Sequence, residues 1–199
     1  MSSFSIDVID ALVGIEEGTV LDLTRNRRPE TKANAQASYA ALFDSGTSSF
    51  TLTERLAVAV FVTGLNAQRE THAHYSGLLA TADPVLEAIV ARYVVSAAGT
   101  GPYGNYPSKG PLFGESVDGI RLRVSDPALG ERLSAAFEHA HLLVFRPREA
   151  SREDLGLLLR AGWDTTGIVS LSQLISFLSF QVRVVSGLRL LASTRIAKD

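Results

Sequence analysis

The fold of this chain is decided by residues 168–185, which read IVSLSQLISFLSFQVRVV. One set of apolar residues recurs here at alternating spacings of three and four: Ile168, Leu171, Ile175, Leu178, Val182 and Val185. This is the period of one face of an α-helix. Further apolar residues, among them Val169 and Phe180, widen that face beyond a single stripe. We therefore expect a helix buried on most of its circumference, either inside a bundle or at a subunit interface.

Shorter helical patterns lie upstream of this segment. Residues 5–13, 31–43 and 71–80 are predicted helices, and Thr53 is the predicted N-cap of another. The pairs Asp83-Pro84 and Asp126-Pro127 combine a capping residue with proline at the first helical position, which is typical of a helix start. Ser151 begins a capping-box pattern. Together these patterns predict an all-α fold.

One long connection interrupts the helices. Residues 99–111, GTGPYGNYPSKGP, contain three prolines and four glycines, which exclude a helix or an interior strand. We expect an irregular connection over about 99–126, with a possible short strand at 117–124. Its aromatic residues Tyr103, Tyr106 and Phe113 are of types enriched at interfaces, so we interpret the segment as a surface arm.

Composition excludes several classes of protein. The 199 residues are 46% hydrophobic and 20% charged, as in an ordinary globular domain. A net charge of −2 argues against nucleic acid as the main partner. The sequence has no cysteine, which excludes disulfides, zinc–thiolate sites and a cysteine nucleophile. No secretory signal is evident, and the uncharged stretch 168–182 is shorter than the roughly 20 residues that span a membrane. We expect a cytoplasmic protein without a membrane partner.

The four histidines form two His-x-His pairs, His72/His74 and His139/His141. Residues two apart on a helix point roughly 200° away from each other, so one pair cannot chelate one metal ion there. A metal site would need one histidine of each pair and a carboxylate such as Glu70 or Glu138. The alternative is that the histidines are buried and hydrogen-bonded locally, which is the commoner case. The sequence therefore gives no firm metal or cofactor site.

A second polar group consists of arginines. Five of them could form an anion site: Arg25, Arg27, Arg28, Arg121 and Arg123. A solvated, ion-paired surface is the commoner outcome for such residues.

Several segments together carry a resemblance to a known family. These are LTERLAVAVFVTGLN at 52–66, GPYGNYP at 101–107, EHAHLLVF at 138–145 and the tail from AGWDTTG at 161 to VRVVSGL at 188. The chain resembles alkylhydroperoxidase and carboxymuconolactone decarboxylase-like proteins, and within them a cysteine-free subfamily of the peroxidase-related branch. The resemblance covers most of residues 30–195. It implies a single helical-bundle domain over 1–199, with residues 1–30 as an N-terminal extension.

Active members of that family carry a Glu followed by Cys-x-x-Cys-x-x-x-His, in which the Glu and His activate a redox thiol pair. Aligned through Asn66, the positions of this motif are Leu56, Gln68, Thr71 and Tyr75. A shift of two residues makes Glu54 the glutamate but restores no other member. Of the branch's C-terminal Asn-x-x-Asn-Arg pattern, only Arg183 remains. Dithiol peroxidase chemistry is therefore excluded, and the resemblance places a degenerate pocket at these residues.

Three functions stay open, of which the last is a mononuclear metal protein that uses His139 or His141. The first is a non-thiol binding or partner protein of an antioxidant or catabolic system, which could act with a cysteine-bearing relative. The alternative is a cysteine-independent acid/base enzyme, of decarboxylase or isomerase type, acting on a small acid or lactone. In that enzyme His72 or His74 would be the general base, close to Tyr75. The resemblance also implies a homo-oligomer, and we expect a dimer or a multiple of dimers, with the arm wrapping a neighbour.

Overall fold

The computed structural model describes residues 6–43, 49–104 and 106–196, and this part of the chain is all helical, with no β-strand. The predicted all-α fold is confirmed. The helices are α1 (Val8–Val13), α2 (Val20–Asn26), α3 (Pro29–Phe43), α4 (Leu52–Leu65), α5 (Arg69–Ala82), α6 (Pro84–Ser96), α7 (Gly130–Phe145), α8 (Arg152–Arg160) and α9 (Thr165–Ile196). Two short 3₁₀ turns, η1 (Phe113–Glu115) and η2 (Pro147–Glu149), complete the structure.

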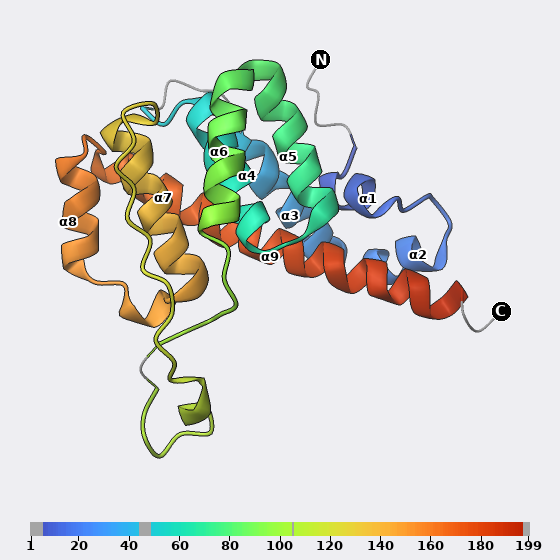
Figure 1. Ribbon diagram of the computed structural model, residues 1–199. Helices are drawn as coiled ribbons and strands as arrows, with labels where there is room; N and C mark the ends of the chain where they lie inside the picture. The colour runs from blue at the N-terminus through green and yellow to red at the C-terminus, as the bar shows by residue number, and fades with distance from the viewer. Residues whose placement is uncertain (1–5, 44–48, 105, 197–199) are drawn as a thin grey trace.

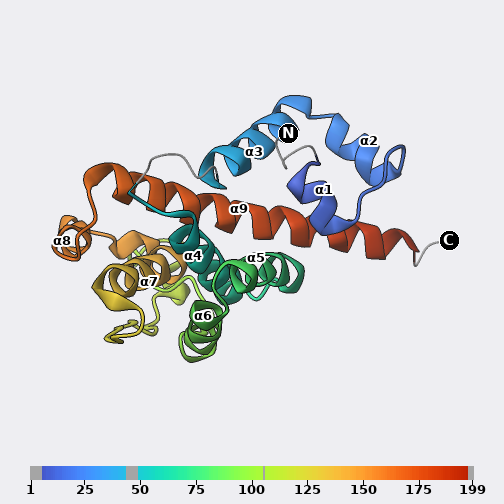
Figure 2. The same cartoon turned by 90° about the horizontal axis from the view of Figure 1, so that it is seen from above.

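The longest helix, α9, runs between two groups of shorter helices. Figure 2 shows α1, α2 and α3 on one side of α9 and α4 to α7 on the other. Leu171, Leu174 and Leu178 have no exposed surface, as predicted for the main apolar stripe of this helix. Val169 and Phe180, which were predicted to widen the buried face, are exposed, so burial over most of the circumference was wrong. From Thr165 to Thr194 the helix is long and apolar enough to cross a membrane. This span is longer than the uncharged stretch 168–182, because it also includes Arg183 and Arg189. Half of the most apolar window is buried within the chain.

Helix α4 is the centre of the second group. All residues from Arg55 to Thr63 are buried, and α4 packs against α5, α6, α7 and α9. The ring of Phe61 stacks on that of Phe137 of α7, with centroids 4.4 Å apart. The N-cap is Thr51 and not Thr53, because Thr51 and Glu54 form a capping box across the first turn. The predicted caps Asp83 and Ser151 are confirmed.

The connection between α6 and α7 is irregular, as predicted, and its middle part around η1 projects from the helices (Figure 1). The possible strand at 117–124 is absent from the described residues. The predicted helix start at Asp126-Pro127 is also wrong. These residues form a turn in which the N–H groups of Leu129 and Gly130 donate to the carbonyl of Asp126. Gly130 has a φ of +72°, so a helix cannot run through it from Asp126.

Arg132 joins three parts of the second group. Its Nε donates to Glu54 at 2.7 Å, and its two terminal nitrogens donate to the carbonyls of Gly162 and Ser49 at 2.7 and 2.9 Å. The guanidinium lies 4.0 Å from the ring of Trp163, whose Nε1 donates to the carbonyl of Arg132. This one side chain thus ties α7 to the start of α4 and to the turn before α9.

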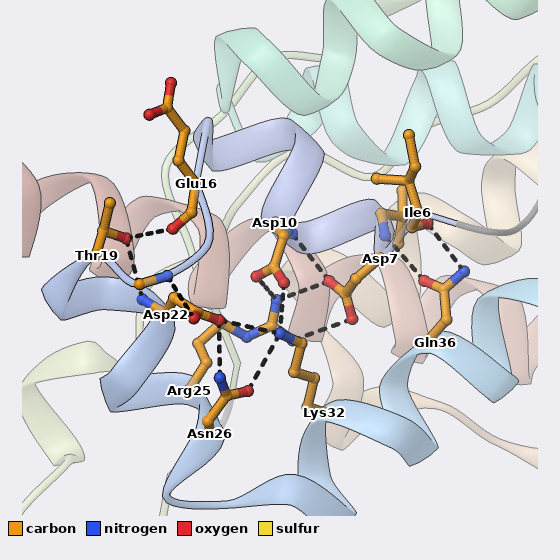
Figure 3. Close-up of polar contacts among 12 residues, drawn as sticks. Ile6, Asp7, Asp10, Glu16, Thr19, Asp22, Arg25, Asn26, Lys32 and Gln36 are labelled. Carbon is orange, nitrogen blue, oxygen red and sulfur yellow. Dashed lines mark hydrogen bonds and ion pairs between the residues drawn. The ribbon is translucent and has the colours of Figure 1, made fainter.

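The three N-terminal helices are held together by ion pairs, drawn in Figure 3. Arg25 of α2 lies between Asp7 and Asp10 and pairs with both, at 2.7 Å from Asp7. Lys32 of α3 contacts Asp10 at 2.7 Å and Asp22 at 3.6 Å. The hydrogen bond with Asp10 raises the pKa of Lys32. Because Val8 and Ile9 of α1 belong to the hydrophobic core, this network fixes the predicted N-terminal extension to α9.

Candidate functional site

The residues at the family's active-site positions lie mostly in the core. Leu56 of α4 and Thr71 and Tyr75 of α5 are buried. Gln68 is the N-cap of α5: its Oε1 accepts from the N–H of Thr71 at 2.6 Å, and its Nε2 donates to Glu70 at 2.8 Å. The side chain of Gln68 therefore acts as a helix cap, which accounts for its burial.

Tyr75 is fully buried and has a fixed partner. Its hydroxyl donates to Oε1 of Gln181 at 2.8 Å, and its ring stacks on Phe43 with centroids 5.2 Å apart. Burial raises the pKa of Tyr75 well above its ordinary value of 10.0. The phenol therefore stays protonated at neutral pH. Two buried atoms of this region, Oγ1 of Thr71 and Nε2 of Gln181, have no hydrogen-bond partner among the described residues.

The two candidate bases lie on different sides of α5. Nδ1 of His72 donates to the carbonyl of Val60 at 3.1 Å. His74 instead lies beside Tyr39, whose hydroxyl is 3.5 Å from its Nε2, and its ring meets that of Tyr75 edge-on at 5.0 Å. Burial lowers the pKa of His74. The structure thus brings His74, but not His72, together with Tyr75.

Arg183 does not join this group. Gln181 of α9 contacts Tyr75, and a residue two positions further along a helix points roughly 200° away. Arg183 is exposed, and its guanidinium donates to the carbonyl of Ser179 at 2.5 Å. The pocket that the resemblance places between Thr71, Tyr75 and Arg183 is therefore not assembled in the described structure.

A large groove lies elsewhere, between α3 and α9. Its volume is about 1100 Å³, and Leu155 of α8 also lines it. Apolar side chains dominate its lining, among them Ile168, Val169, Phe177 and Phe180. Val169 and Phe180 are 56% and 40% exposed, which is unusual for large apolar residues of a core helix. The groove is thus an exposed apolar surface in concave form.

Polar groups are interspersed along the same groove. Hydroxyl and amide side chains line it from both helices: Thr31, Asn34 and Ser38 of α3, and Ser170, Ser172, Gln173 and Ser176 of α9. Arg55 lies in the lining as well, but its guanidinium donates to the carbonyls of Phe50 and Leu42 at 2.9 and 2.7 Å. The lining therefore offers neutral hydrogen-bonding groups beside a mainly apolar surface, as small-molecule sites do.

The second histidine pair lines a much smaller pocket, of about 70 Å³, on α7. His139 and His141 are both buried, and burial lowers the pKa of each. Nε2 of His139 lies 3.2 Å from the hydroxyl of Ser172, and His141 has a hydrogen bond to the backbone of Ala97. The described residues contain no group of three His, Asp or Glu side chains that could hold a metal ion. The two histidine pairs are thus not joined by a carboxylate in one site.

The five candidate arginines form no common anion site. Arg25 is held between Asp7 and Asp10, Arg121 pairs with Glu149, and Arg123 pairs with Glu138. Arg27 and Arg28 are exposed. Ion pairing, the commoner outcome, therefore applies to three of the five.

Comparison of the chain with models of known protein families and with curated proteins finds no match. The resemblance to alkylhydroperoxidase-like proteins therefore stays a prediction.

Sequence reasoning missed the groove because its walls come from distant segments. Val169 and Phe180 were expected to widen a buried face. With Gln173 and Ser176 they form a separate stripe at spacings of four, three and four. The two polar residues between the apolar ends of this stripe are the signal that distinguishes it from the fully apolar stripe of Leu171, Ile175 and Leu178.

Proposed function

We propose that this chain is a non-thiol binding protein that holds an elongated, mainly apolar small molecule in the groove between α3 and α9. The single observation that carries the proposal is the groove itself, an open concave surface of about 1100 Å³. Pockets for small ligands commonly measure about 300–1000 Å³ and combine apolar walls with a few polar groups. The lining described above has this composition.

Chemistry supports binding rather than thiol catalysis. The chain has no cysteine, so a dithiol cycle has no nucleophile. An acid/base enzyme at the family positions would need its base and acid in a pocket that substrate can enter. Tyr75 is fully buried and keeps its proton, and of the two candidate bases only His74 contacts it, while His72 lies away. A ligand in the groove meets none of these three residues, because the groove is lined by other side chains.

The proposed binding function is also compatible with the resemblance to alkylhydroperoxidase-like proteins. A binding protein on an alkylhydroperoxidase-like scaffold would retain the helical bundle and lose the redox motif. The absence of cysteine and the apolar or neutral residues Leu56, Gln68 and Thr71 at the motif positions support such a role. Service to an antioxidant or catabolic system, and a cysteine-bearing partner, remain predictions from the resemblance alone.

The test uses an uncharged fluorescent apolar dye, Nile red, and the purified chain. We expect saturable binding with enhanced fluorescence, and more than about tenfold weaker binding in the variants Val169→Glu and Phe180→Glu, because each places an unpaired charge in an apolar site. Val95→Glu is the matched control. Val95 is 78% exposed on α6 and does not line the groove, so its replacement is expected to leave dye binding unchanged.

Two results would contradict the proposal. One is equal dye binding by the Val169→Glu variant and the unmodified chain, since it would place the dye elsewhere. The other is turnover of an organic hydroperoxide with a dithiol reductant, which would show redox catalysis without cysteine.

A further inference from the structure

The groove adjoins a second pocket that differs from it in charge. This pocket has a volume of about 200 Å³ and lies between α9 and the N-terminal helices. Thr31, Ala35 and Phe180 line both the groove and the pocket, so the two adjoin at these residues. On α9 the combined lining reaches from Ile168 to Leu188, which corresponds to about 30 Å at a rise of 1.5 Å per residue.

The second pocket has an apolar wall and a cationic wall. Ile9, Val184 and Leu188 supply apolar side chains, and Phe180 stands at the junction with the groove. The cationic wall of the pocket consists of three side chains, Arg25, Arg28 and Lys32. The lining thus changes between the groove and the adjoining pocket, from neutral and apolar at Val169 to cationic at the N-terminal helices.

The three cations are not equally available. Arg25 is paired with Asp7 and Asp10, and Lys32 with Asp10 and Asp22, in the network of Figure 3. Arg28 is exposed, and its guanidinium has no ion pair or hydrogen bond among the described residues. It immediately precedes α3, whose first turn contains Thr31 and has backbone N–H groups without intrahelical acceptors. A free positive charge therefore lies at this end of the surface.

From this charge distribution we infer that the ligand is an amphipathic carboxylic acid. Its carboxylate binds the guanidinium of Arg28, which can donate two parallel hydrogen bonds to it. Its apolar chain passes Phe180 and lies along α9 in the groove, where it removes apolar surface from water. The inference rests on the proposed function and specifies the chemical class of the ligand.

The test compares two ligands that differ only in the head group, decanoate below its critical micelle concentration and decanol below its solubility limit in water. Titration calorimetry on the full chain is expected to show tighter binding of decanoate. The variant Arg28→Gln should weaken decanoate binding by about threefold to tenfold and leave decanol binding unchanged. Added salt should reduce the difference between the two ligands. Arg27→Gln is the matched control, because Arg27 is exposed, adjacent in sequence and absent from both linings.

The outcomes separate this inference from the proposed function. If decanol binds as tightly as decanoate, or if Arg28→Gln leaves decanoate binding unchanged, the assignment of the acid is wrong while the binding function stands. If neither ligand binds and Nile red does not bind, the proposed function fails and the inference fails with it. A third result overturns both the inference and the proposed function. In it, no ligand binds, and light scattering shows a dimer that the variant Phe180→Ser dissociates. A second copy of the chain would then fill the groove.

Discussion

The hydroxyl of Tyr75 donates a hydrogen bond to Oε1 of Gln181 across 2.8 Å, although 106 positions separate the two residues in the sequence. Both side chains have no exposed surface. The bond joins α5 to the middle of α9, and Nε2 of the same amide has no partner among the described residues. The core therefore contains a polar contact that apolar packing would not require.

Loss of this contact has a defined cost. We expect Tyr75→Phe to lower the free energy of unfolding by about 1–3 kcal/mol, because the amide of Gln181 then stays buried without its partner. The double variant Tyr75→Phe/Gln181→Met should recover part of this loss, since both polar partners are replaced by apolar groups. Urea unfolding measures both effects. Equal stability of Tyr75→Phe and the unmodified chain would show that the bond contributes nothing.

Stability should fall as the solution is acidified below about pH 6.5. Burial lowers the pKa of His74, His139 and His141 from the ordinary value of 6.5. The unfolded chain therefore binds protons at a higher pH than the folded chain. The histidine contribution is complete above about pH 6.5 and is lost as the pH falls through the lower, folded-state values. The slope reaches at most about 1.4 kcal/mol per pH unit for each histidine.

Unfolding by urea at a series of pH values measures this dependence. In the variant His139→Gln the slope below pH 6.5 should be smaller, because one of the three groups no longer titrates. An identical slope in this variant would remove His139 from the explanation.

Arg132→Lys should destabilise the chain by about 2–3 kcal/mol. Lysine retains the charge, but its single ammonium cannot reach Glu54, Ser49 and Gly162 at once, nor stack on Trp163 as a planar group. Thermal or urea unfolding tests this. Arg160→Lys, at an exposed position at the end of α8, is the control and should change stability little. A similar loss in both variants would contradict the role assigned to Arg132.

A further prediction concerns the oligomeric state. We expect a dimer or a multiple of dimers, because Leu190 and Leu191 of α9 and Phe113 of the connection are large apolar residues that a single chain leaves exposed. Leu190 lines neither the groove nor the second pocket, so Leu190→Glu should dissociate an oligomer formed through this end of α9 without blocking the ligand. Light scattering that shows a stable monomer of 21.3 kDa at micromolar concentration would contradict the expectation.

Local patterns predicted the helices because their signals lie within a few residues. The spacing of Leu171, Ile175 and Leu178 and the pair Asp83-Pro84 each depend on one or two helical turns. Two predicted helix starts were wrong, because in each case a single residue determined the local structure against the sequence pattern. Glu54 selects Thr51 as the cap of α4, and the positive φ of Gly130 ends the turn at Asp126-Pro127 before α7 begins.

The candidate site was less accessible to sequence reasoning, because it depends on contacts between distant segments. Nothing local indicates that Thr31 and Phe180 meet across a groove, or that Arg28 keeps a free charge while Arg25 is paired twice. The resemblance placed the site at Tyr75, where the structure has a packed core. Only the packing of the helices in three dimensions shows which of these two locations has an open site.

The position of α9 between two layers also has a consequence for the order of folding. Helices α1 and α3 pack on α9, which is synthesised after them and after α4 to α8. During translation, Val8, Ile9 and Tyr39 have no α9 surface to cover until α9 has emerged from the ribosome. Until then, the apolar faces of α1 and α3 that pack on α9 stay exposed, a state that favours aggregation. Closing this long-range contact is expected to be the slow step of folding.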